Sequence, residues 1–231
     1  MKGDSRKILV ICDSHGTKWG ANGYGELLNE NFDECEVTLL RFGGISLEKI
    51  YKSLVDKKFE SYDFVILGVG NPDVHPRFPI RFKKAALKLG VLVKESYFCI
   101  PPFFCFTYFA RIPTFILKLV LIRFWKESYL EKEEVVFYFS KIHELFRNKC
   151  TKVIILPLFY VSNIYGGYHN DNVFYVNRVL KKNFRDDFLE GKVFEGSYYR
   201  RFYNKDFFHF TQSYQYDIYE SIKERMLQHK R

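Results

Sequence analysis

Apolar runs of strand length alternate with amphipathic segments along most of the chain. A run of about 4–8 apolar residues predicts a buried strand, whereas apolar residues spaced three and four apart predict the inner face of a helix. We expect strands at 7–12, 36–42, 63–68, 152–158 and 192–194, and helices at 24–32, 45–55, 135–147, 173–184 and 212–228. This alternation predicts an α/β fold, a three-layer α/β/α sandwich whose parallel sheet has helices on both faces.

The segment 78–130 does not follow this rhythm. It is rich in Phe, Leu and Ile, yet it contains Pro101, Pro102 and Pro113 and several basic residues. A membrane-spanning helix needs about 20 mostly apolar residues in a row, so these prolines and charges argue against a span. Two interpretations stay open: a cap inserted after the third strand, or an aromatic and basic surface at 97–125 that contacts a membrane peripherally.

Length and composition narrow the class of protein. The 231 residues are expected to form a single domain, 1–231, with the insertion inside it. The five scattered cysteines favour reduced thiols, and no apolar signal region precedes the first strand, so we expect a cytoplasmic protein, with peripheral attachment to the inner face of the membrane as an option. The net charge of +9 favours anionic partners, but no nucleic-acid-binding motif is present, and nucleic acid is not expected.

A serine, a histidine and a carboxylate lie in segments that a parallel sheet would bring to one edge. Ser14 comes directly after the first strand, and Asp206 and His209 form a D-x-x-H segment before the last helix. Open α/β sheets place their sites at the carboxyl ends of the strands. A histidine that takes the serine proton, oriented by a carboxylate, converts a weak nucleophile into a strong one. We predict Ser14 as nucleophile, His209 as general base and Asp206 as its orienting residue, whereas His15 is too close in sequence to Ser14 to accept its proton.

Two further polar segments follow predicted strands, Gly43-Gly44 and Gly70-Asn71-Pro72-Asp73. Together with Asp13, the serine and the D-x-x-H segment, this order resembles the SGNH hydrolase superfamily, also called GDSL esterases and lipases, over essentially the whole chain. The resemblance implies a flavodoxin-like sheet and acyl transfer to water or to another hydroxyl.

The resemblance also implies an oxyanion hole. Its donors would be the backbone N–H of Ser14, the backbone N–H of Gly44 or Gly43, and the side chain of Asn71. The family pattern in this block is G-x-N-D, and if Asp73 matches the aspartate, Pro72 falls on the asparagine and offers no donor. Both alignments stay open. Cys12 departs from the pattern too, since it stands where glycine is expected.

The segment from Gly70 to Arg77 is also similar to a variant found in SGNH-like proteins of bacterial surface-polysaccharide gene clusters. That likeness makes Arg77 a candidate contact for an anion or carboxylate, the alternative being an arginine that only ties down its loop. Asp13, Gly43 and Asp73 are the other candidate substrate-binding residues.

We expect a cofactor-free acyl hydrolase or O-acyltransferase acting on an acylated, chiefly acetylated, sugar of a surface polysaccharide or its lipid-linked precursor. A lipase or thioesterase with an apolar lid is one alternative, and a non-catalytic protein that docks on membrane-associated glycan assembly machinery is another. No H-x-H, HExxH or C-x-x-C motif predicts a metal, and His169 and Asp171 are expected in a polar loop. No Walker A or G-x-G-x-x-G motif predicts a nucleotide cofactor.

Overall fold

Four parallel strands form the central sheet in the order β2-β1-β3-β6. The strands are β1 (Arg6–Cys12), β2 (Cys35–Arg41), β3 (Tyr62–Gly68) and β6 (Cys150–Ile155). The structure, a computed structural model, describes residues 5–18, 22–32, 35–76, 92–94, 97–99, 128–161, 167–195, 203 and 209–229. The chain runs from β1 outward to β2 and then back across to β3, so the strand order reverses beside β1. Open α/β sheets bind ligands at such a reversal.

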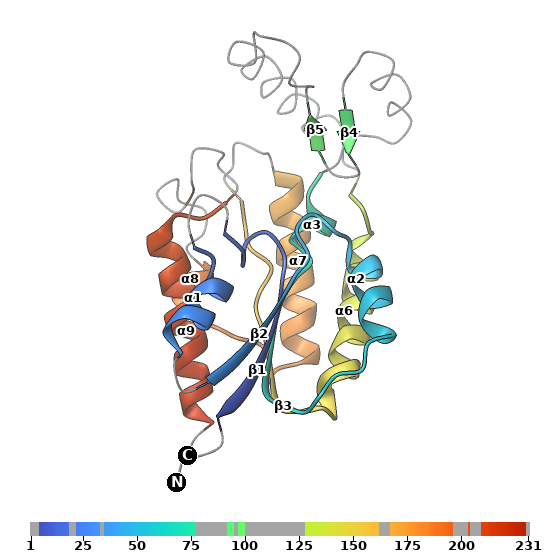
Figure 1. The fold of residues 1–231 in the computed structure, drawn as a ribbon. Helices are drawn as coiled ribbons and strands as arrows, with labels where there is room; N and C mark the ends of the chain where they lie inside the picture. Colours follow the sequence, from blue (N-terminus) through green and yellow to red (C-terminus); the bar gives the residue numbers. More distant parts are fainter. Residues whose placement is uncertain are drawn as a thin grey trace.

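Helices cover both faces of the sheet, which confirms the predicted three-layer α/β/α architecture (Figure 1). One face carries α2 (Leu47–Val55), α6 (Lys132–Arg147) and α7 (Gly167–Asn183), and the other carries α1 (Tyr24–Asn31), α8 (Lys192–Glu195) and α9 (Gln212–Gln228). A short helix, α3 (Asn71–Val74), follows β3, and an antiparallel pair, β4 (Leu92–Lys94) and β5 (Tyr97–Cys99), lies farther along the chain.

The apolar runs of the strands are explained by burial on both faces. In β1, Leu9 and Ile11 point into the core beneath α2, α6 and α7, whereas Ile8 and Val10 point into the core beneath α1 and α9. Successive strand residues face opposite sides of a sheet, so a strand covered twice needs apolar residues at every position. The same requirement accounts for the runs in β3 and β6.

Two predictions about the last third of the chain are wrong. Residues 192–194 lie in helix α8 rather than in a strand, and Phe188 alone forms a parallel bridge with Ile155. Three residues are too few for periodicity to separate strand from helix. His169 and Asp171 lie in the first two turns of α7 rather than in a polar loop. In the first turn, the Asn170 side chain exchanges two hydrogen bonds with the backbone of Val161 and so anchors the start of the helix.

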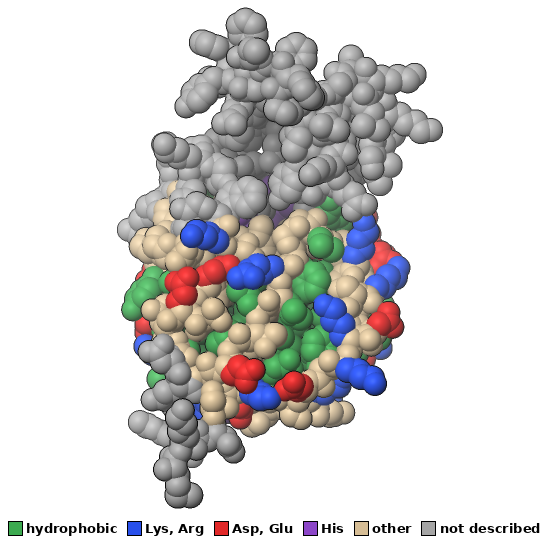
Figure 2. All heavy atoms as spheres, in the orientation of Figure 1, with side chains coloured by type: hydrophobic (Ala, Val, Ile, Leu, Met, Phe, Trp, Pro, Cys, Tyr) green, Lys and Arg blue, Asp and Glu red, His purple; other side chains and the backbone are tan. Residues whose placement is uncertain are grey.

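The predicted insertion at 78–130 lies outside the described residues, apart from β4, β5 and 128–130, so its role as a cap or a membrane contact stays a prediction. None of the described helices is long and apolar enough to cross a bilayer. On the face shown in Figure 2, basic and acidic side chains of the described residues are intermingled, so their positive charge is not gathered into one patch there.

Candidate active site

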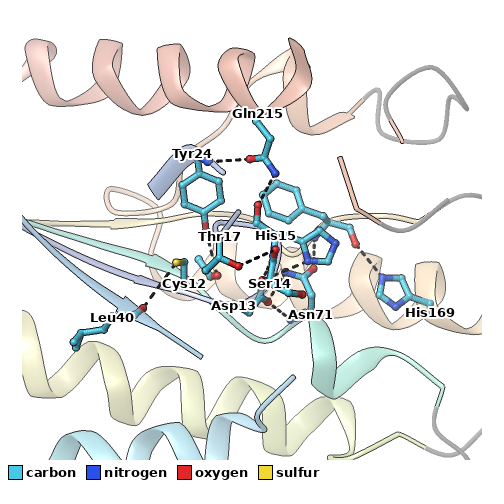
Figure 3. A network of polar contacts seen from close by, with 12 residues as sticks. Cys12, Asp13, Ser14, His15, Thr17, Tyr24, Leu40, Asn71, His169 and Gln215 are labelled. Carbon is cyan, nitrogen blue, oxygen red and sulfur yellow. Dashed lines mark hydrogen bonds and ion pairs between the residues drawn. The ribbon is translucent and has the colours of Figure 1, made fainter. Parts of the chain in front are cut away.

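The turn that carries Ser14 begins where β1 ends. The backbone N–H of Asp13 donates to the carbonyl oxygen of Gly68 at 3.0 Å and extends the pairing of β1 with β3. The N–H of Gly16 then donates to the carbonyl oxygen of Asp13 at 3.1 Å and closes the turn. Ser14 is therefore held at the carboxyl edge of the sheet, beside the end of β3 (Figure 3).

The buried carboxylate of Asp13 stabilises this turn through hydrogen bonds to His15 and Asn71. Its Oδ1 accepts from the backbone N–H of His15 at 2.9 Å and lies 3.3 Å from His15 Nδ1, while its Oδ2 accepts from the backbone N–H and from Nδ2 of Asn71, at 3.2 and 2.9 Å. Burial taken alone raises the pKa of this fully buried carboxyl, but the hydrogen bonds and charge of His15 and the side chain of Asn71 outweigh it, and the pKa lies below its usual value. Both oxygens are occupied, which favours a structural role over the predicted contact with substrate.

Asn71 is the residue of its block that lies beside the nucleophile turn. Its Oδ1 accepts from the backbone N–H of Phe159 at 2.7 Å, and its Nδ2 faces Asp13. A backbone N–H only donates and a carboxylate only accepts, so these two partners fix which end of the amide faces which way. The structure therefore favours the alignment in which Asn71, and not Pro72, occupies the asparagine position. Its role as an oxyanion donor stays a prediction.

The turn after β2 lies next to the end of β1, because the N–H of Phe42 donates to the carbonyl oxygen of Cys12 at 2.8 Å. Gly44 has φ 70°, a left-handed conformation that residues with a Cβ rarely adopt. Gly43 is exposed, and a Cβ added to it would meet nothing within 4 Å. Gly44 is therefore the residue of this turn whose left-handed backbone requires a glycine, whereas Gly43 has room for a side chain.

His209 lies just before α9 and is buried, with 5% of its surface exposed. Its ring packs against the ring of His15, with a centroid distance of 5.6 Å and an interplanar angle of 36°. Since His15 follows Ser14 directly, the predicted base lies beside the turn that carries the predicted nucleophile, although the two segments are far apart in the sequence. Asp206 and Arg77 lie outside the described residues, and their roles stay predictions.

Solved structures of several esterases share this architecture. An acetylxylan esterase from Geobacillus stearothermophilus has a TM-score of 0.59 at 15% identity, over 98% of this chain and 96% of that chain. The esterase EstA from Pseudoalteromonas sp. has a TM-score of 0.57 at 10% identity, over 96% and 97%. A member of the lipolytic protein G-D-S-L family from Veillonella parvula has a TM-score of 0.56 at 13% identity, over 94% and 96%.

This chain has the fold of the SGNH hydrolases. No protein-family model matches its sequence, and no curated protein matches it either. At identities this low the likeness lies in the arrangement of strands and helices. It agrees with the order of segments that the sequence predicted, with Ser14 after the first strand and His209 before the last helix.

Gln215, on α9, is a site residue of this SGNH fold that the sequence did not reveal. Its Nε2 donates to the carbonyl oxygen of His15 at 2.6 Å, and its Oε1 accepts from the backbone N–H of Tyr24 at 3.0 Å (Figure 3). A buried side chain on the helix that follows His209 thus holds the turn that follows Ser14. A glutamine in an amphipathic helix carries no signal of such a role, because its partners are remote in sequence.

Asp73 and Cys12 both lie beneath the surface of the site. Asp73 is fully buried, and its Oδ2 accepts from the backbone N–H of Leu47 at 3.0 Å, which satisfies a free donor at the start of α2. This contact favours a structural role over substrate binding. Burial, and secondarily the charge of Asp13, raises the pKa of the Cys12 thiol well above its usual value, so this thiol is not a competing nucleophile at neutral pH.

No group of three or more histidine, cysteine, aspartate or glutamate side chains among the described residues is arranged to hold a metal ion. The chemistry available there is that of a serine hydroxyl, neighbouring histidine rings and hydrogen-bond donors at a sheet edge.

Proposed function

We propose that this chain is a serine-dependent carboxylic ester hydrolase whose substrate is an acetylated carbohydrate. The observation that carries the proposal is the packing of the His209 ring against His15, the residue after Ser14, at the edge where Asn71 also lies. The fold supports it, and the substrate class is suggested by neighbours described as an acetylxylan esterase and an acetyl-xylooligosaccharide esterase.

In this mechanism Ser14 Oγ attacks the ester carbonyl carbon while His209 takes the hydroxyl proton. Negative charge forms on the former carbonyl oxygen, and the N–H groups of Ser14 and Gly44, with the second hydrogen on Asn71 Nδ2, stabilise it. His209 then protonates the leaving sugar oxygen, and the C–O bond to the sugar breaks. Asp206 orients His209 and stabilises its charged form.

To hydrolyse the acyl-enzyme, His209 removes a proton from an incoming water, whose oxygen attacks the acyl carbon. The bond from that carbon to Ser14 Oγ then breaks, His209 returns the proton to Oγ, and the carboxylic acid leaves. If a sugar hydroxyl takes the place of water, the same steps give O-acyl transfer. The acceptor is therefore the feature that separates hydrolase from transferase. A surface polysaccharide or its lipid-linked precursor is the proposed physiological substrate.

Ester turnover and covalent labelling together test the proposal. The purified chain should hydrolyse a chromogenic acetyl ester faster than an octanoyl ester, release acetate from acetylated xylo-oligosaccharides, and react with a fluorophosphonate probe. Ser14→Ala and His209→Ala should each abolish labelling and lower kcat by more than about 10³-fold.

The matched control is Ser221→Ala, because the Ser221 hydroxyl bonds to the carbonyl oxygen of Asp217 within α9. It should keep full labelling and turnover. Labelling that survives in Ser14→Ala would exclude Ser14 as the nucleophile, and a preference for octanoyl esters would favour a lipase.

A further inference from the structure

Two buried histidines, His75 and His169, have no part in the proposed mechanism but are linked to Asn71, one through α3 and the other through the backbone of Phe159. His75 directly follows α3, whose first residue is Asn71, and His169 lies in the first turn of α7. Their Nδ1 atoms are 3.3 Å apart, and the two side chains are 4% and 0% exposed. A buried polar group is costly unless hydrogen-bonded, so the partners of this pair indicate what it stabilises.

His169 is bonded to the backbone segment that orients Asn71. Its Nε2 lies 2.9 Å from the carbonyl oxygen of Phe159, and the N–H of the same residue donates to Asn71 Oδ1 (Figure 3). A carbonyl oxygen can only accept, so Nε2 of His169 carries a hydrogen. In the neutral ring Nδ1 is then an acceptor, and the donor between the two rings is Nδ1–H of His75.

Phe159 connects the two sides of the site. Its backbone is held by Asn71 on one side and by His169 on the other. Its ring packs against His15, at a centroid distance of 5.5 Å, and against Phe210, at 4.9 Å. A displacement of Phe159 would therefore move the N–H that donates to the Asn71 amide oxygen, and it would also disturb the packing around His15 and His209.

We propose that His169, supported by His75, is a positioning residue for acyl transfer: it fixes the orientation of the Asn71 side chain through the backbone of Phe159. The inference rests on the proposed function, because it gives the amide of Asn71 the task of binding the oxyanion. If Phe159 moved, the amide oxygen of Asn71 would lose its donor, and its Nδ2 would no longer be directed by two fixed partners. Small errors in the placement of such a donor lower the rate strongly.

A double-mutant cycle tests this inference. His169→Phe keeps a ring but removes the donor to Phe159, and should lower kcat by about ten- to a hundredfold with KM within about twofold. His169→Gln retains an N–H donor and should recover most of the loss. In an Asn71→Ala background, His169→Phe should lower kcat by less than about threefold further, because residues that act through one group are not additive.

The matched control is His143→Phe, since His143 is also a buried histidine bonded to one partner, Asp187, at 2.8 Å. It should lower the melting temperature but leave kcat per folded molecule within about twofold. Equal losses in the His143 and His169 variants, or full multiplication of the losses in the double variant, would reduce His169 to a folding role and overturn the inference.

A second measurement is independent of turnover. The side-chain amide signals of Asn71 in a ¹⁵N–¹H spectrum, assigned by their loss in Asn71→Ala, should shift and exchange faster with water in both the His169→Phe and His75→Phe variants, and stay unchanged in His143→Phe. Unchanged Asn71 signals in His169→Phe would refute the positioning role even if the protein hydrolyses no ester. Shifted signals in a protein without turnover would support the positioning and count against the proposed function alone.

Discussion

The side-chain amide of Gln215 donates to the carbonyl oxygen of His15 at 2.6 Å, across 200 positions of sequence. The same side chain accepts from the first helical N–H of α1, at Tyr24. Three elements that meet at the nucleophile turn are thus joined by one buried amide. These two hydrogen bonds of Gln215 help to fix the position of the turn that carries Ser14.

We expect Gln215→Leu to lower both stability and turnover. The substitution leaves two buried backbone groups without their partner, which costs about 2–4 kcal/mol of unfolding free energy. It also frees the turn after Ser14 from α9, so kcat should fall by more than the loss of folded protein explains. Urea unfolding and the acetyl-ester assay measure the two effects.

The control is Gln212→Leu, one turn earlier on α9. Gln212 also exchanges hydrogen bonds with a backbone, that of Asn22, but at an exposed position. Its loss should change the unfolding free energy by less than about 1 kcal/mol and leave kcat unchanged. Equal effects of the two substitutions would show that the contact with His15 has no special role.

Neighbouring glycines after β2 should differ in their tolerance of alanine. Gly44→Ala places a Cβ on a residue with φ 70° and should cost about 1–2 kcal/mol. If the turn moves to relieve that strain, the Gly44 N–H leaves the proposed oxyanion hole, and kcat should fall. Gly43→Ala has open space around the new methyl group and should be tolerated. Unfolding curves and kcat for the pair check this, and an order opposite to the one expected would refute the assignment to Gly44.

A methyl group at Gly68 should collide with Tyr24, because an added Cβ would lie 1.9 Å from the Tyr24 hydroxyl oxygen. Gly68→Ala should therefore destabilise the fold by about 3 kcal/mol or more. Tyr24→Phe removes that oxygen, and the double variant should be more stable than the sum of the single losses implies. Gly191→Ala, whose nearest contact would be 3.8 Å away, is the control. Additive losses in urea unfolding would contradict the predicted collision.

Asp13 should make stability depend on pH in the acid range. Its folded pKa lies below that of the unfolded chain, so the carboxylate stabilises the fold above pH about 4, and this contribution is lost as the pH falls through the folded value. Asp13→Asn should therefore be less stable at pH 7 and should lose less stability between pH 5 and pH 2 than the unmodified chain.

Urea midpoints across that range provide the test, with Asp217→Asn, at an exposed position on α9, as control. Asp187 should retain part of the acid dependence, because its pKa is also lowered: burial acts to raise it, and the hydrogen bonds from His143 and Lys152 outweigh that effect. An acid dependence unchanged by Asp13→Asn would show that the Asp13 carboxylate contributes nothing to it.

The sequence predicted most of the fold because the strands are buried on both faces. That burial makes 7–12 and 63–68 continuous apolar runs, and the amphipathic spacing placed the last helix at 212–228, as found. The short segment 192–194 was misassigned because its apolar residues pack equally well from a helical turn. There Phe194 is buried in the core beside α9.

The site was predictable where it follows from strand ends. Ser14 and Asn71 come after adjacent parallel strands, so their proximity follows from topology. The roles of Gln215 and His169 were not predictable from the sequence. Each role depends on a hydrogen bond from the side chain to a backbone carbonyl oxygen outside its own helix, that of His15 for Gln215 and that of Phe159 for His169. The sequence holds no periodic trace of such contacts.

Two segments far apart in the sequence meet at the site: the turn at 13–16 is completed only when His209 and α9 pack against it. During synthesis, the amide of Gln215 leaves the ribosome 200 residues after His15, the residue that follows Ser14. The predicted nucleophile therefore stays without its predicted base until this later segment has been synthesised. Ester turnover in this protein would report that α9 has packed against the turn after β1, and removal of α9 alone should abolish it even if the strands stay intact.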